Sequence, residues 1–124
     1  MSEAATYLAT VVEHYRRPHN QRALASPTRV HEGVNPLCGD RVRMELDVRD
    51  GVLRDAAFAA SACAIATASA SLLTDRVRGA TVEEALQVDE ESVVVALGAG
   101  VPAARRSCAI LPLRVLRQAL SQPS

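Results

Sequence analysis

Lysine and tryptophan are absent from this chain, and aromatic side chains are scarce, with one Phe and two Tyr. Without lysine the protein has no side chain for Schiff-base chemistry, and none for the type of phosphate-binding loop that requires a lysine. With so few aromatic rings, the core must consist mainly of Ala, Val and Leu. A chain of 124 residues is long enough to bury a core of its own, so we expect a single domain over residues 1–124.

The chain also lacks an excess of charge, because 14 basic and 14 acidic side chains give a formal net charge of zero. Its arginines are scattered rather than gathered into a stripe, which argues against nucleic acid as the main partner. No apolar run is long enough to cross a bilayer, and the first residues lack the basic start of a signal peptide. We expect no membrane partner and a cytoplasmic location.

Cysteine is sparse as well, and the three cysteines, Cys38, Cys63 and Cys108, lie far apart in the sequence. Three thiols cannot all pair within one chain, and cytosolic thiols stay reduced, so metal binding or thiol chemistry is favoured over a disulfide framework. Gly39 separates Cys38 from Asp40, and a tight turn at this glycine aims a thiol and a carboxylate at one metal ion. Such a site requires folding to bring three separate segments together.

Hydrophobic periodicity predicts both strands and helices. Apolar and charged residues alternate over 41–49, and Asp50-Gly51 favours a hairpin turn into an antiparallel strand over 52–59. A strand over 28–32 is weakly patterned. Helices are predicted over 3–17, from Cys63 to a stop at Gly79, over 81–86 with a capping box at Thr81, over 89–97, and from about Ile110 to Leu120.

Three thiolates and one carboxylate form a tetrahedral donor set that suits zinc, and the same set can hold a small iron-sulfur cluster. The candidates are Cys38, Asp40, Cys63 and Cys108. Cys63 and Asp40 also have structural interpretations. Cys63 can be a core residue, as free cysteine often is, and Asp40 can cap the turn, as Asp beside Gly often does.

Cys108 is predicted at or just before the N-terminus of the last helix, where the helix dipole favours a thiolate. The two preceding arginines, Arg105 and Arg106, are expected to lower its pKa, unless they are only a solvated face. His14, His19 and His31 show no ligand spacing and are interpreted as structural or surface residues. The cysteines and the aspartate therefore carry the prediction of a site.

Four segments resemble, in order, motifs of the U-type iron-sulfur scaffold family, which includes IscU, SufU and the NifU N-terminal domain. The segments are 14–20 (HYRRPHN), 35–40 (NPLCGD), 63–71 (CAIATASAS) and 105–109 (RRSCA), the last followed by Leu-Pro-Leu. The resemblance implies an α+β fold, with a small antiparallel sheet of about three strands packed against several helices and a metal site at one end.

The resemblance also implies that Cys38, Asp40, Cys63 and Cys108 are the ligand positions for zinc or a [2Fe-2S] cluster at one shared site, with Arg105 in a supporting role. A cysteine desulfurase would deliver persulfide sulfur to Cys38 or Cys108, and iron-sulfur acceptor proteins would receive the cluster. Such a protein is a scaffold or sulfur carrier rather than a classical enzyme.

Two alternatives stay open: a zinc-bound sulfurtransferase that activates a desulfurase, and a non-transferring adaptor with a structural metal. The wording of the second and third motifs is closer to SufU, but the insertion usual in SufU-like members is missing. Ser107 also stands where IscU-like members have histidine, and their Leu-Pro-Pro-Val-Lys chaperone motif is replaced by Gly-Val-Pro-Ala-Ala at 100–104.

Overall fold

The computed structural model describes residues 3–98 and 100–122. Helices and strands follow one another in the order α1 (Glu3–Arg16), β1 (Arg29–Val34), β2 (Arg41–Arg49), β3 (Val52–Ser61), α2 (Ala64–Val77), α3 (Val82–Leu86), α4 (Glu90–Leu97), the short 3-10 helix η1 (Ala103–Arg105) and α5 (Arg106–Leu120). Within this described part of the chain, no helix combines the length and the hydrophobicity needed to cross a bilayer.

The three strands form one antiparallel sheet in the order β1-β2-β3, which confirms the predicted α+β fold. The alternation that predicted β2 is observed, since Val42, Met44 and Leu46 have no exposed surface. Asp50 and Gly51 have φ values of 54° and 75°. Positive φ at both central residues defines a type I′ hairpin turn, whose twist matches that of the flanking strands.

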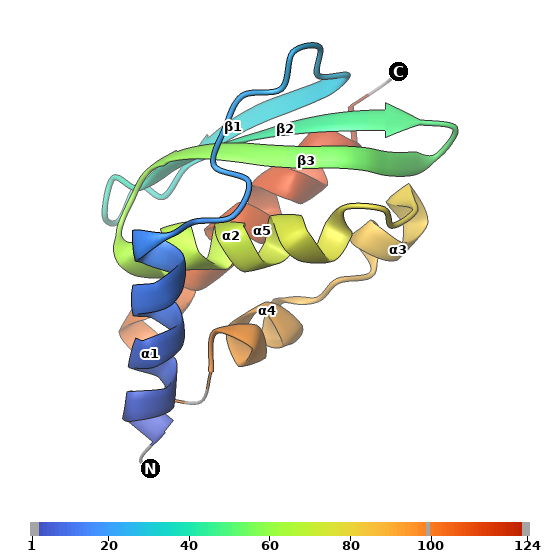
Figure 1. The fold of residues 1–124 in the computed structure, drawn as a ribbon. Helices are drawn as coiled ribbons and strands as arrows, with labels where there is room; N and C mark the ends of the chain where they lie inside the picture. The colour runs from blue at the N-terminus through green and yellow to red at the C-terminus, as the bar shows by residue number, and fades with distance from the viewer. Residues whose placement is uncertain (1–2, 99, 123–124) are drawn as a thin grey trace.

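Helices α2 and α5 cover one face of this sheet, as Figure 1 shows. Helix α5 packs on β1 and β2, and α2 packs on β3. The main hydrophobic core fills the space between them and includes Phe58, Leu73 and Leu116. The β1–β2 loop and the N-termini of α2 and α5 all lie at the end of the molecule where α1 packs against α2 (Figure 1).

The two short helices begin as their sequences predict. The Thr81 hydroxyl accepts a hydrogen bond from the Glu84 N–H, and the Glu84 carboxylate accepts one from the Thr81 N–H, so the capping box before α3 is complete. The Asp89 carboxylate accepts from the Ser92 N–H at 2.8 Å and caps α4. Capping of this kind satisfies N–H groups that the first turn of a helix leaves free.

Helix α5 differs from the prediction, because it begins at Arg106 rather than near Ile110 and contains Pro112 in its interior. Proline lacks the N–H that would donate to the carbonyl of Cys108, a loss that costs about 3 kcal/mol in a helix. Burial offsets this cost, since Ala109, Ile110 and Pro112 are all buried against neighbouring elements. As a consequence, Cys108 lies in the first turn of α5, at the N-terminal end of the helix, where it was predicted to lie at or just before the first residue.

Candidate metal centre

Backbone hydrogen bonds to Asn35 shape the β1–β2 loop, which carries two of the predicted ligands. The Asn35 carbonyl accepts from the Gly39 N–H at 2.7 Å and from the Cys38 N–H at 3.3 Å, while the Asn35 N–H donates to the Asp40 carbonyl at 2.8 Å. Gly39 has a φ of 77°, which a residue with a Cβ rarely adopts. The resulting tight turn leaves Cys38 exposed and Asp40 buried.

The Asp40 carboxylate is buried and points toward the start of α2. Its Oδ1 accepts from the Cys63 N–H at 3.1 Å, and Cys63 is the N-cap residue of that helix. The positive end of the helix dipole therefore favours the carboxylate. Asp40 Oδ2 is also buried, and it has no hydrogen-bond partner among the residues that the structure describes. The interpretation of Asp40 as a simple turn cap is wrong, since its side chain bonds a residue outside the loop.

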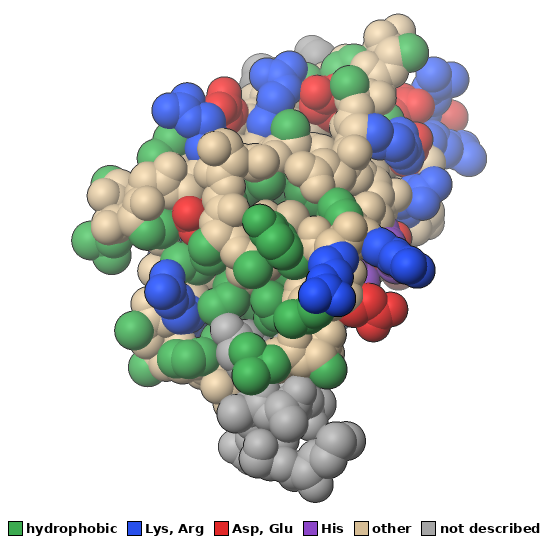
Figure 2. Space-filling view, turned by 60° about the vertical axis from the view of Figure 1, so that its left-hand side comes forward, with side chains coloured by type: hydrophobic (Ala, Val, Ile, Leu, Met, Phe, Trp, Pro, Cys, Tyr) green, Lys and Arg blue, Asp and Glu red, His purple; other side chains and the backbone are tan. Residues whose placement is uncertain are grey.

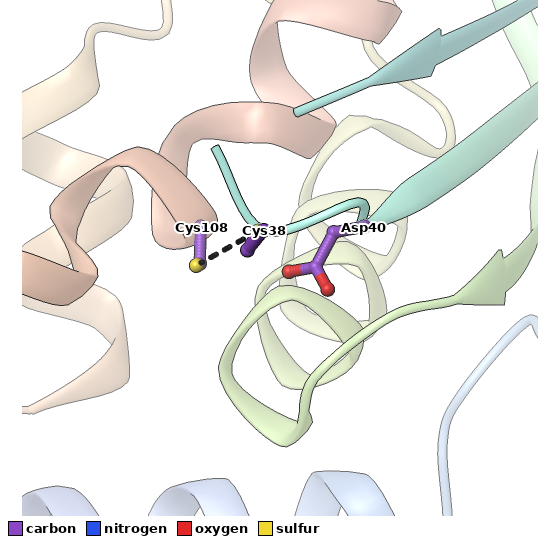
Figure 3. A group of neighbouring side chains, drawn as sticks. All are labelled: Cys38, Asp40 and Cys108. Atoms are coloured by element: carbon purple, nitrogen blue, oxygen red, sulfur yellow. Dashed lines mark hydrogen bonds between the residues drawn. The ribbon is translucent and has the colours of Figure 1, made fainter. Parts of the chain in front are cut away.

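Cys108 reaches the loop from the first turn of α5. Its side chain is buried, and its Sγ lies 3.8 Å from the Sγ of Cys38. Figure 3 shows the side chains of Cys38 and Cys108 near the carboxylate of Asp40, at the place where the β1–β2 loop passes the start of α5. One ligand atom of each of these three residues lies within 4.8 Å of the other two. The structure thus brings together side chains from the loop and from a helix that follows it by more than sixty residues.

Cys63 lies next to this group without being part of it. Its backbone N–H bonds Asp40, and its half-buried side chain interacts with the Cys108 thiol. Cys63 and Cys108 thus stand at the N-termini of the two helices that cover the sheet. Both helix ends carry partial positive charge from unpaired N–H groups, which favours anionic ligands at this position.

The predicted lowering of the Cys108 pKa is wrong. Burial, together with the neighbouring thiols of Cys38 and Cys63, raises the pKa of Cys108 to about 12. Arg105 is exposed, and Arg106 pairs with Glu91 at 3.1 Å. Desolvation of the thiolate therefore outweighs the helix N-terminus and the arginines.

Exposed apolar side chains flank Cys38 in the sequence. Leu37 is 86% exposed at the tip of the loop, and Val34 at the end of β1 is 46% exposed. The other large apolar side chains that are exposed are Leu8, Val12 and Tyr15 on α1, Leu86 on α3 and Val95 on α4. Figure 2, which brings this end of the molecule forward, shows hydrophobic side chains gathered between charged ones. A hydrophobic surface next to an exposed thiol is suited to protein contacts.

With this geometry established, comparison with known proteins identifies the family. The family model described as NifU-like N terminal domain matches residues 6–123. The chain belongs to this family. The family resemblance that the four motifs indicated is thereby confirmed. The similarity to IscU and SufU proteins is confirmed as well, because relatives with these names match most of this chain.

An iron-sulfur cluster assembly scaffold protein IscU from Archaeoglobus fulgidus is 33% identical over 114 residues, which cover 92% of this chain and 74% of the relative. The IscU scaffold of Thermotoga maritima is 31% identical, with 95% and 94% covered. A zinc-dependent sulfurtransferase SufU from Bacillus subtilis is 33% identical over 68% of this chain and 56% of its own length. The N-terminal part of a nitrogen-fixing NifU-like protein from Brucella abortus has the same fold, with a TM-score of 0.77, 23% identity, and 96% of this chain and 95% of that chain covered.

Sequence reasoning missed polar residues that hold this NifU-like domain together. Ser71 Oγ lies 2.7 Å from Nδ1 of the buried His14 and accepts from the backbone N–H of His19 at 2.8 Å. The His19 ring in turn pairs with Asp75. The first motif (14–20) is therefore joined to the third motif (63–71) through α1 and α2. The order of the motifs in the sequence was the available signal, but it does not say which side chains meet.

Proposed function

We propose that this NifU-like chain is an iron-sulfur cluster assembly scaffold that receives persulfide sulfur from a cysteine desulfurase, builds a labile cluster and passes it to acceptor proteins. The observation that carries the proposal is the convergence of Cys38, Asp40 and Cys108 within 4.8 Å. The relatives named as IscU scaffolds support it. The chemistry needs reduced thiols, so we place it in the cytoplasm.

The donor set fits a thiophilic metal. Thiolate ligands select zinc and iron-sulfur clusters, and the buried Oδ2 of Asp40 is free to provide an oxygen donor. We propose Cys63 as the fourth ligand, because it adjoins both Asp40 and Cys108. When bound, the metal would hold the thiols in their deprotonated form. An oxygen donor among sulfur ligands holds a cluster less firmly, which suits a protein that releases it.

Exposure separates the two candidate sulfur acceptors. Cys38 is exposed on its loop, whereas Cys108 is 2% exposed and its pKa is raised to about 12 by burial. A buried, protonated thiol is a poor nucleophile. We therefore propose that the Cys38 thiolate attacks the terminal sulfur of the desulfurase persulfide. A sulfur–sulfur bond forms at Cys38, the bond in the desulfurase breaks, and the desulfurase cysteine leaves as a thiolate, with no net oxidation.

A second candidate is a zinc-bound sulfurtransferase, which the identity to SufU of Bacillus subtilis favours. In that case the bound zinc orders the thiols, Cys38 passes sulfur onward, and a desulfurase turns over faster when the protein is added. We propose that Arg105, which is exposed just before α5, contacts the incoming partner in either case.

The test combines metal analysis of the purified protein with anaerobic reconstitution by ferrous iron, cysteine and a desulfurase. A visible charge-transfer absorption that is lost with Cys38→Ser or Cys108→Ser, and whose cluster moves to an apo-ferredoxin, supports the scaffold. Stoichiometric zinc, no cluster uptake and faster desulfurase turnover support the sulfurtransferase instead. A chelator that unfolds the domain, together with no effect on the desulfurase, would show that the metal is only structural.

A further inference from the structure

Asn35 connects the two parts of the site through its side chain. Its Nδ2 donates to the hydroxyl oxygen of Ser107 at 3.2 Å, although the two residues are 72 positions apart. Asn35 begins the loop that carries Cys38, and Ser107 immediately precedes Cys108 in the first turn of α5. This hydrogen bond therefore runs beside the contact between the two thiols.

The other polar groups of Asn35 are already committed to the loop. Its Oδ1 accepts from the Leu37 N–H at 3.1 Å, and its backbone carbonyl and N–H close the turn at Gly39 and Asp40. Asn35 is only 7% exposed. The side chain of Asn35 thus provides both a hydrogen-bond acceptor for the turn and a hydrogen-bond donor for α5. Aspartate has no such donor at neutral pH.

We propose that the hydrogen bond between Asn35 and Ser107, here called the Asn35–Ser107 bridge, positions Cys38 against Cys108 and so sets the affinity of the site for a thiophilic metal ion. Cys38 and Gly39 are exposed on the loop, so the pairing of β1 with β2 does not by itself hold the Cys38 thiol against α5. The bridge fixes the loop to the helix one residue before the second thiol. Its effect on metal affinity rests on the proposed function, whereas its effect on the distance between the sulfurs does not.

The test measures that distance chemically in the metal-free protein. In a Cys63→Ser background, which leaves one possible pair, diamide oxidises Cys38 and Cys108 to a disulfide, with two thiol protons and two electrons passing to the diazene. We expect Ser107→Ala to slow disulfide formation by about three- to tenfold, the factor for one neutral hydrogen bond. Ser107→Thr keeps the hydroxyl and should restore the rate. Alkylation of Cys38 by iodoacetamide should be unchanged in all variants, because its exposure does not change.

The same Asn35 and Ser107 substitutions, made with Cys63 in place, are then titrated with Co²⁺, whose thiolate charge-transfer band reports coordination. Loss of a group that orients ligands typically weakens metal binding by about 10- to 100-fold, and we expect Ser107→Ala to do so while Ser107→Thr does not. With Asn35→Ala in place, adding Ser107→Ala should cause no further loss. Equal oxidation rates in Ser107→Ala and the parent, equal slowing by Ala and Thr, or additive losses would overturn the proposal. Failure of the parent to bind Co²⁺ would count against the metal function alone, since the oxidation rates would still report on the bridge.

Discussion

Replacing Asp40 by asparagine should make the metal-free protein more stable and the metal-bound site weaker. The substitution keeps Oδ1, which accepts from the Cys63 N–H at 3.1 Å, and removes the charge shared with the buried Oδ2, for which residues 3–98 and 100–122 offer no hydrogen-bond partner. Leaving a buried polar group unpaired costs about 1–3 kcal/mol, and more if it is charged. The neutral amide still lacks a full set of partners and loses the attraction of the carboxylate to the N-terminus of α2, so we expect a net gain of about 1 kcal/mol rather than the whole penalty.

Urea unfolding in the presence of a chelator measures this gain, because an unchanged slope with a higher midpoint reports a change in stability. Asp40→Ala is the matched control. It removes the unpaired oxygen but also the acceptor for the Cys63 N–H, so it should be less stable than Asp40→Asn by about 1–3 kcal/mol.

The zinc affinity of both variants should fall by at least about tenfold, since even an outer partner of a ligand has effects of this size. Opposite signs for stability and affinity are the signature of a residue retained for binding rather than for folding. An Asp40→Asn variant that is destabilised in chelator, or that binds zinc as tightly as the parent, would refute the assignment of Asp40 as a ligand.

Two further perturbations test the fold around the site. Burial and then the nearby His19 lower the pKa of His14 below 6.5, so just below pH 6.5 His14 binds a proton more readily in the unfolded chain than in the folded one. The free energy of unfolding should therefore be highest above pH 6.5 and fall as the pH drops from 6.5 toward the lowered pKa. The urea midpoint of His14→Gln should depend less on pH than that of the parent, and parallel pH dependences would contradict the prediction. A Cβ at Gly33 would lie 2.7 Å from Val115 Cγ2, so Gly33→Ala should cost about 1–3 kcal/mol, and less in a Val115→Ala background; additive losses by thermal unfolding would contradict this contact.

The parts of the fold that depend on residues adjacent in the sequence were predictable from the sequence alone. The hairpin follows from alternation in β2 and from Asp50-Gly51, whose preference for positive φ needs no tertiary contact. The capping box at Thr81 is likewise local. The start of α5 was not predictable, because the local preference against Pro112 in a helix loses to burial on the sheet and on α2. Tertiary packing decides that boundary.

The sequence indicated which side chains lie together better than it indicated their electrostatics. Spacing at residues 38–40 predicted that Cys38 and Asp40 face one place, and their ligand atoms do lie within 4.8 Å of each other and of that of Cys108; their binding of a metal stays a prediction. The pKa of Cys108 was predicted with the wrong sign, since the charges of nearby arginines are visible in a sequence but burial is not. The Asn35–Ser107 bridge was invisible for the same reason, because neither residue has a local signal for a partner 72 positions away.

The placement of the candidate ligands explains how one chain can hold cargo and release it. Cys63 and Cys108 are fixed by helices whose packing forms the core, so they cannot move without disturbing the fold. Cys38 instead lies on an exposed loop, and the described contacts that hold it to α5 are a thiol contact and the Asn35–Ser107 bridge. Opening of the loop would expose the site to a partner at the cost of a few weak interactions, so we expect exchange to take place through the loop rather than through either helix.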